Sequence, residues 1–412
     1  MEKAKIQKYA ELFARVGGNV QKGDAVVIDA DTQDAAFARL LAESAYDLGA
    51  KEVFHRWDDS ICRRLKYLRA GDEAFDAFPQ WLTDSYDHFD AQKAVLLYIE
   101  SDDPDLLAGV SASRVSRYQA ARNAALKKHR ELSMSNAVRW SIAAIPSPAW
   151  ARKIFPTLAG DEAVEKLWQA IMEITRMNEP DPIEAWHRHN QNFQGRLAYL
   201  NQKNFRSLRY RNALGTDLTV EMPEGHLWLG GAEHDKEGVP FNPNIPTEEI
   251  FSAPKRDGVN GRVVSSMPLS YNGNLIENFE FTFQDGQAIS FKAKKNEEIL
   301  RGLLDNDGGA RYLGEIALVP FDSPITRMGL LFYNTLFDEN ASCHFALGKG
   351  YPVCLAGSDS MSAAEVAKAG VNDSLIHVDF MVGTEDLSVI GLDKDGVETP
   401  VFVNGKFAQD KS

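Results

Sequence analysis

Four short segments in the second half of the sequence carry carboxylates and imidazoles with which this chain could bind a metal ion. The first holds Glu248 and Glu249 in a proline-bounded stretch, residues 243–254. Because prolines restrict the backbone at both ends, one carboxylate could bind a metal while its neighbour accepts a proton. Adjacent acids are also common on solvated surfaces, so a solvated pair is the alternative here.

The second and third segments each contribute one candidate ligand. Glu315 stands directly before the apolar run 316–319, at the mouth of a predicted strand, where a sheet would fix its Cα. The alternative is a solvated strand end. His344 lies among small and apolar residues, with Tyr351 further along the same segment. A histidine in such a setting can equally be a hydrogen-bonded core residue, and its neighbour Cys343 is expected to serve packing.

The fourth segment gives the clearest isolated metal signal. His377 and Asp379 fall in the run 374–383, which is typical of a strand, and residues two apart on a strand point to the same face. An imidazole and a carboxylate there could bind one ion, and a strand-edge histidine with an acidic neighbour is the alternative. By contrast, His187 and His189 on a predicted helix point about 200° apart and cannot chelate one ion.

The four segments together supply oxygen and nitrogen donors but no thiolate. This set is larger than one catalytic zinc with an open position requires, and it suits two ions that share a carboxylate. The common catalytic motifs HExxH, GxSxG and the P-loop are absent from the sequence, as is a recognisable Cys–His nucleophile.

The first half of the sequence alternates between apolar runs and helical patterns. Short apolar runs typical of buried strands occur at 25–28, 51–57, 94–99 and 138–145. Helical patterns follow Asp34, cover 112–132 and 161–177, and begin again at Asp181, which offers an N-cap followed by Pro182. Alternation of this kind predicts a parallel sheet covered by helices. No GxGxxG follows any of these strands, so nucleotide binding is not expected.

The second half changes character after Phe205. Alternating runs at 206–211 and 217–222 predict strands, and the runs 277–283 and 288–294 flank an Asp-Gly pair that is typical of a tight hairpin. We therefore expect an α/β protein in two domains: an N-terminal parallel-sheet α/β domain over 1–205, and a mixed, largely antiparallel α+β metal-binding catalytic domain over 206–412.

Composition limits the class of protein. The 412 residues are 44% hydrophobic and 25% charged, with a formal net charge of −14 at pH 7, which is typical of a globular protein and gives no basic surface for nucleic acid. Three cysteines without a CxxC motif predict neither a disulfide framework nor a thiolate zinc site. With no apolar run long enough for a membrane span and no signal-like N-terminus, we expect a cytoplasmic protein without a membrane partner.

Over essentially its whole length the sequence resembles the M29 family of metallo-aminopeptidases, which contains aminopeptidase T and aminopeptidase S (PepS). Four motifs in the same order carry the resemblance: Ile245-Pro-Thr-Glu-Glu-Ile-Phe, Leu313-Gly-Glu-Ile-Ala-Leu-Val-Pro, Leu336-Phe-Asp-Glu-Asn and His377-Val-Asp-Phe-Met-Val-Gly. Each motif alone is weak, and the ordered set is specific.

The resemblance implies a binuclear site. Its ligands would be Glu249, Glu315, His344, His377 and Asp379. Glu315 would bridge two divalent ions (Zn, Co or Mn), Glu248 would be the general base, and Tyr351 would sit beside the ions and donate to the oxyanion. A hydroxide held by the two ions would attack the first peptide carbonyl of a short peptide. The family also implies a homodimer.

Two other functions remain open on the sequence. The same fold family includes Fe(II) ring-cleaving dioxygenases, whose single iron is held by two histidines and a carboxylate, and His344, His377 and Asp379 could form such a triad. That activity does not require Glu249 and Glu315, whose presence favours the peptidase. The second alternative is a non-catalytic protein that binds metal or peptide.

Overall fold

The computed structural model describes residues 1–271 and 273–411. The chain divides into two compact units. The first unit comprises Met1–Asn190 and Ala232–Pro246, and the second comprises Gln191–Gly231 and Thr247–Ser412. The domain boundary expected after residue 205 remains a prediction. Within the described ranges, no helix combines the length and apolar character needed to cross a membrane.

A five-stranded parallel sheet organises the first unit. Its order is β10-β4-β3-β1-β2, and each neighbouring pair is parallel. The strands are β1 (Ala25–Asp31), β2 (Glu52–Asp58), β3 (Val95–Glu100), β4 (Trp140–Ala144) and β10 (Asn244–Ile245). The first four are the runs from which the sequence predicted a parallel sheet, and that prediction is confirmed.

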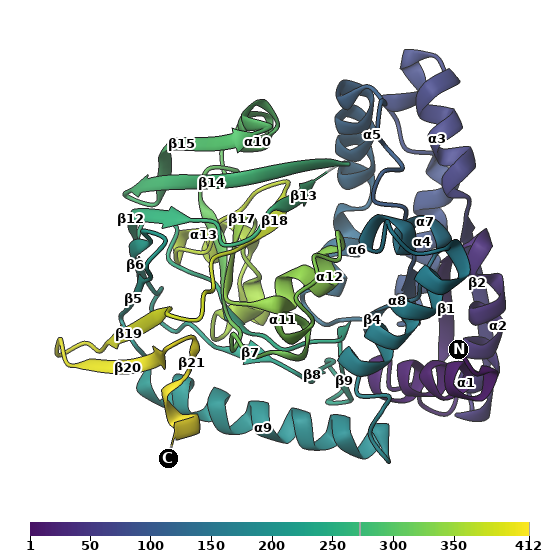
Figure 1. Ribbon diagram of the computed structural model, residues 1–412, viewed down its shortest axis with the longest axis horizontal. Helices are drawn as coiled ribbons and strands as arrows, with labels where there is room; N and C mark the ends of the chain where they lie inside the picture. Colours follow the sequence, from purple (N-terminus) through teal and green to yellow (C-terminus); the bar gives the residue numbers. More distant parts are fainter. Residues whose placement is uncertain (272, 412) are drawn as a thin grey trace. The chain divides into compact units, whose positions relative to one another are not determined.

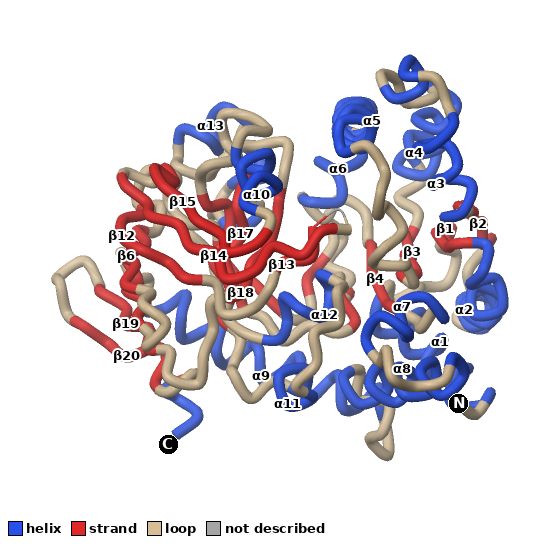
Figure 2. The backbone as a smooth tube through the Cα atoms, turned by 45° about the horizontal axis from the view of Figure 1, so that its top comes forward, coloured by secondary structure: helices blue, strands red, loops and turns tan. Residues whose placement is uncertain are grey.

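Helices cover both faces of this sheet, as the apolar character of its strands requires (Figure 2). On one face Phe89 of α4 packs with Val27 and Leu96. On the other, the Tyr9 ring of α1 lies 5.6 Å from that of Phe37 of α2. The helices are α1 (Lys3–Leu12), α2 (Ala35–Asp47), α3 (Ser60–Arg69), α4 (Gln80–Ala91), α5 (Ala112–Ala125), α6 (Lys127–Met134), α7 (Pro148–Ile154) and α8 (Gly160–Ile174).

Helix α9 (Pro182–Lys203) leads from the first unit into the second. Its start follows the predicted capping pattern: the backbone N–H of Glu184 donates to the Asp181 carboxylate at 3.0 Å, and Pro182 is the first helical residue. A small two-stranded sheet of β8 (Glu233–His234) and β9 (Pro240–Phe241) completes the first unit.

The larger sheet of the second unit is antiparallel. Its order is β13-β14-β12-β6-β5-β19-β20-β21, and β15 pairs with β14. The predicted hairpin is present (Figure 1): β14 and β15 are joined by Asp285 and Gly286, which both have positive φ, as a type I′ turn requires. The strands are β5 (Ser207–Arg211), β6 (Asp217–Glu221), β12 (Val259–Val264), β13 (Leu269–Tyr271), β14 (Asn274–Gln284), β15 (Gln287–Lys295), β19 (Ser388–Leu392), β20 (Glu398–Val403) and β21 (Lys406–Phe407).

A second antiparallel sheet in this unit has the order β18-β17-β16-β11-β7. Its strands are β7 (Leu229–Gly230), β11 (Ile250–Ser252), β16 (Leu313–Leu318), β17 (His344–Gly348) and β18 (His377–Met381). The helices of the unit are α10 (Glu297–Leu304), α11 (Pro324–Met328), α12 (Thr335–Asp338) and α13 (Ala363–Lys368). A parallel first sheet followed by antiparallel sheets confirms the predicted fold class.

One face of this second sheet is apolar and packs into the core of the unit. Ile316, Leu318, Phe345, Leu347 and Phe380 all point into one cluster of buried residues. Because side chains alternate along a strand, the residues between them point to the opposite face. That opposite face carries the candidate ligands.

A β-bulge at Gly314 directs Glu315 to the ligand face. Leu313 is paired with Leu347 and Glu315 with Ala346. Over this stretch β16 therefore has one residue more than β17, and that extra residue is Gly314. Without the bulge, Leu313 and Glu315 would share a face. With it, Leu313 reaches the apolar core while Glu315 points away.

Gly314→Ala should therefore damage the site as well as the fold. A Cβ there would lie 2.4 Å from the carbonyl oxygen of Gly348, a backbone clash that only a shift of β16 can relieve. We expect a loss of roughly 1–3 kcal/mol in the free energy of unfolding, measured with urea, and weaker divalent-metal binding. Gly302→Ala is the control: it adds a methyl group in open space on α10 and should gain about 0.5–1 kcal/mol. Equal stability of the two variants would refute the role given to the bulge.

Candidate metal centre

Four of the predicted site residues lie on the same face of the β7–β18 sheet. Glu315 is in register with Ala346 of the next strand, and Ala346 with Asp379 of the strand beyond. His344 lies two residues before Ala346, and His377 two before Asp379, so all of them share this face. The small side chain of Ala346 leaves room between the two carboxylates.

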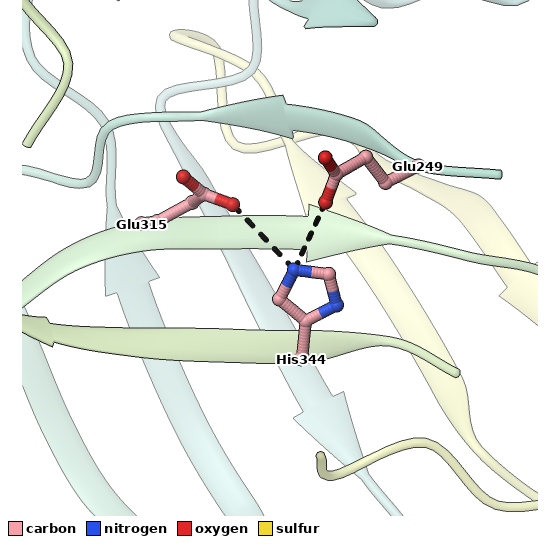
Figure 3. Close-up of side chains that lie close together, drawn as sticks. All are labelled: Glu249, Glu315 and His344. Carbon is pink, nitrogen blue, oxygen red and sulfur yellow. Dashed lines mark ion pairs between the residues drawn. The ribbon is translucent and has the colours of Figure 1, made fainter. Parts of the chain in front are cut away.

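Glu249, Glu315 and His344 form the first group of ligand atoms. Figure 3 shows both carboxylates directed at the imidazole. The Nε2 atom of His344 lies 3.0 Å from a carboxylate oxygen of Glu249 and 3.5 Å from one of Glu315. One ligand atom from each residue lies within 4.8 Å of the other two, and all three residues are buried. Such a group can hold one metal ion.

Glu315, His377 and Asp379 form the second group, again with ligand atoms within 4.8 Å of one another. The Nε2 atom of His377 lies 3.4 Å from Asp379 Oδ1 and 3.6 Å from the second oxygen of Glu315. Glu315 thus faces His344 with one carboxylate oxygen and His377 with the other. This is the geometry of a bridging carboxylate.

Backbone carbonyls fix both imidazoles with Nε2 toward the carboxylates. The Nδ1 atom of His344 lies 3.2 Å from the carbonyl oxygen of Ser342, and that of His377 lies 2.7 Å from the carbonyl oxygen of Lys349. Because Nδ1 donates its proton to a carbonyl, Nε2 is the nitrogen that can bind a cation once it has lost its own proton. Outer contacts of this kind orient metal-binding histidines.

Burial and neighbouring charges shift the pKa values of Glu315, His344 and His377. Burial raises the pKa of Glu315, and the charges of Glu249 and Asp379 raise it further. Burial lowers the pKa of His377, but the carboxylates of Asp379 and Glu315 outweigh it and raise that pKa to about 9. The pKa of His344 is raised well above its usual range in the same way, chiefly by Glu249 against the effect of burial. The face therefore carries an excess of negative charge that a cation can neutralise.

Three ligand atoms are better placed to bind a metal ion than to hydrogen-bond with one another. The Nε2 atom of His344, Oε2 of Glu249 and Oδ1 of Asp379 are buried, and although ion pairs of 3.0 and 3.4 Å link the two carboxylate oxygens to His344 and His377, none of the three makes a hydrogen bond of good geometry within the described residues. A buried polar atom without a partner costs about 1–3 kcal/mol. Carboxylate oxygens and imidazole nitrogens are also donors that divalent cations of the zinc, cobalt and manganese type accept. The residues present therefore fit a bound divalent metal.

Tyr351 and Glu248 lie outside the two ligand groups. The ring of Tyr351 packs edge-on against His377, with 5.1 Å between ring centroids. Burial, reinforced by the charges of Glu315 and Asp379, raises the pKa of its phenol well above its usual value, so the hydroxyl stays protonated. Glu248 is buried, and its backbone N–H donates to Asn340 Oδ1 at 2.6 Å.

Glu339 is a member of the cluster to which the sequence reasoning gave no role. Burial raises its pKa well above the usual range, and the charges of Asp379 and Glu249 raise it further. These charges act on Glu339 only because it lies close to the ligands. On the sequence, Glu339 in the motif 336–340 is only a possible addition to the acids of the four segments, without a stated role.

Comparisons with known proteins identify relatives of this chain. The model of the family described as thermophilic metalloprotease (M29) matches residues 2–407. The chain is 45% identical over 403 residues to aminopeptidase 2 from Geobacillus stearothermophilus, covering 98% of this chain and 97% of that protein. It is 43% identical to aminopeptidase T from Thermus thermophilus, covering 98% of each.

Two solved structures resemble the fold. Wild-type AmpT from Thermus thermophilus superposes with a TM-score of 0.91 at 42% identity, covering 98% of this chain and 99% of that one. A 2,5-dihydroxypyridine dioxygenase from Pseudomonas putida superposes with a TM-score of 0.52 at 13% identity, covering 99% of this chain and 98% of that one. At that identity the second likeness concerns the fold alone.

Metal binding should stabilise the protein through the shared carboxylate. We expect zinc, cobalt or manganese added to metal-stripped protein to raise the melting temperature, since a ligand at 100 times its Kd contributes about 2.7 kcal/mol. Glu315→Gln should remove most of this rise because Glu315 belongs to both groups. The control is His226→Gln, which changes a buried imidazole bound to the Pro223 carbonyl and should leave the rise intact. An undiminished rise in Glu315→Gln would exclude the shared ligand.

Proposed function

The chain belongs to the M29 family of metallopeptidases, and we propose that it is an aminopeptidase that releases N-terminal residues from short peptides with the help of two divalent metal ions. The observation that carries the proposal is the sharing of Glu315 between two groups of ligand atoms. A single ion needs only one such group, whereas a carboxylate shared by two groups suits two neighbouring ions.

In this proposal Glu249 and His344 hold one ion, His377 and Asp379 hold the other, and Glu315 binds both. Zinc, cobalt and manganese are the candidate metals. When bound, such ions lower the pKa of a coordinated water and polarise the carbonyl of the scissile peptide. The protonated Tyr351 hydroxyl beside His377 is the proposed donor to the oxyanion, a role worth about 3–4 kcal/mol in other enzymes.

Two carboxylates are candidates for the general base. Glu248 is the base expected from the sequence; it is buried and adjoins the ligand Glu249. Glu339 is the alternative, because burial and the charges of the ligands Asp379 and Glu249 raise the pKa of its carboxyl group. A base works best when its pKa lies near the working pH, and a raised carboxylate pKa moves toward that condition.

The dioxygenase alternative has weaker support. The likeness to the dioxygenase concerns the fold, at 13% identity, and a single iron held by His344, His377 and Asp379 would leave Glu249 without a role. Metal analysis separates the two: two ions per chain with peptide hydrolysis support the proposal, and one iron with oxygen consumption would replace it.

Substitution of each candidate base should identify the residue that moves the proton. Glu248→Gln and Glu339→Gln keep side-chain shape but remove proton acceptance. We expect the variant at the base to lose roughly 10²- to 10⁴-fold in kcat on a dipeptide while metal content per chain is unchanged. The other variant is then the matched control. Full activity in both variants would show that neither carboxylate is the base.

The proposed assembly is a homodimer, and α3 offers a surface for it. Ile61, Leu65 and Leu68 follow helical spacing and are 64%, 50% and 43% exposed. Polar side chains of the same helix contact the rest of the protein: Arg64 donates to the carbonyl of Ala108 at 2.8 Å, and the Lys66 Nζ atom lies 3.5 Å from the Tyr118 ring centroid. An exposed apolar stripe on a helix is typical of an interface, and a second copy of the chain can present the same stripe to it.

Leu65→Glu should therefore convert the protein to a monomer in analytical ultracentrifugation, because it places a charge in the middle of the stripe. Ile289→Glu is the control, since Ile289 is 54% exposed on β15 and belongs to no such stripe. A wild-type monomer would refute the dimer, and a dimeric Leu65→Glu variant would move its interface elsewhere.

We also propose a cytoplasmic location for the enzyme. Cys62, Cys343 and Cys354 are free thiols in the structure. Proteins of reducing compartments keep their cysteines in this form.

A further inference from the structure

The Asn340 side chain lies between the segment that carries Glu248 and Glu249 and the turn that carries Glu339. It is completely buried. Its Oδ1 accepts the backbone N–H of Glu248 at 2.6 Å. Its Nδ2 donates to the carbonyl of Leu336 at 3.0 Å and makes a longer contact of 3.4 Å with Glu339 Oε1. One amide thus joins two segments that are far apart in the sequence.

The segment it holds is the least supported part of the ligand set. Strand β11 begins only at Ile250, so Glu249 stands just before the ladder that would fix its backbone. Glu315, His377 and Asp379 lie within strands, and β18 is paired with β17 along its entire length from His377 to Met381. A ligand outside a strand depends more on side-chain contacts for its position.

We propose that Asn340 is a positioning residue that holds Glu249 in place through the backbone of Glu248. The inference rests on the proposed function in taking Glu249 as a metal ligand. Asn340 then supports the group of Glu249, Glu315 and His344. The group of Glu315, His377 and Asp379 is held by the pairing of its strands and does not depend on Asn340. Loss of the amide should therefore weaken one metal site and spare the other.

The expected size follows from comparable contacts. Substitution of residues that orient metal ligands typically costs 10- to 100-fold in metal affinity. In Asn340→Ala the backbone N–H of Glu248 would also lose a buried acceptor, so the segment has a reason to move.

The experiment is calorimetric titration of metal-stripped protein with manganese or zinc. Wild-type protein should bind two ions, and Asn340→Ala should bind one of them at least tenfold more weakly with the other changed less than threefold. Asn340→Ser keeps a neutral oxygen that can accept the Glu248 N–H, and it avoids the buried charge that aspartate would place against the Leu336 carbonyl and Glu339. It should lower the ratio of the two affinities less than Asn340→Ala does. That rescue also covers the case in which the alanine variant folds poorly.

Asn212→Ala provides the matched control. Asn212 accepts a backbone N–H from Thr216 at 3.1 Å and donates to the Val382 carbonyl at 3.2 Å, so it loses the same kinds of bond elsewhere in the unit. It should leave both affinities unchanged. Equal weakening of the two sites in Asn340→Ala, or a ratio lowered as far in Asn340→Ser as in Asn340→Ala, would overturn the proposal.

The readout is independent of peptide hydrolysis. If the wild-type protein binds two ions but does not cleave peptides, the proposed function fails while the affinity ratio still tests Asn340. If it cleaves peptides and the ratio is unchanged by Asn340→Ala, the inference fails alone.

Discussion

The second unit buries several carboxylates close together, where their negative charges repel one another. Glu249, Glu315 and Asp379 face the same small space, and two imidazoles supply less positive charge than these acids need. Burial raises the pKa of Glu315 and of Glu339, and the charges of the neighbouring acids raise both further. Removing one charge from water is costly, and crowding like charges adds to the cost, so a bound cation would stabilise the arrangement. The sheet, its bulge and the contacts of both imidazoles with backbone carbonyls all keep these charged side chains close together.

A β-sheet meets this demand because its two faces are chemically independent. The apolar face of β16, β17 and β18 packs into the core, and the ligand face carries acids, imidazoles and small residues such as Ala317 and Ala346. Strands move little relative to one another, so ligands on neighbouring strands keep their separations without help from a metal. The bulge at Gly314 is the one irregularity, and it lets an apolar residue and a ligand follow each other closely on the same strand.

The groups proposed to move protons sit on less regular parts of the chain than the ligands. Glu248 lies before β11 and Glu339 in a single turn after α12, whereas the histidines and Asp379 lie on strands. Asn340 joins these two irregular segments. Most of the proposed metal ligands therefore lie on a rigid sheet, whereas the two candidate bases lie on segments whose positions depend on a few side-chain contacts.

The sequence alone determined the alternation of strands and helices, the hairpin at Asp285 and Gly286, and the residue types from which a metal centre can be made. These are local properties: periodicity, turn chemistry and the pairing of His377 with Asp379 on one strand need no knowledge of distant segments. The tertiary structure alone decided that Glu315 faces both histidines, that the bulge at Gly314 turns it to the ligand face, and that Glu339 joins the cluster. Register, bulges and the shared burial of charges depend on which strands pair, and no single segment carries that information.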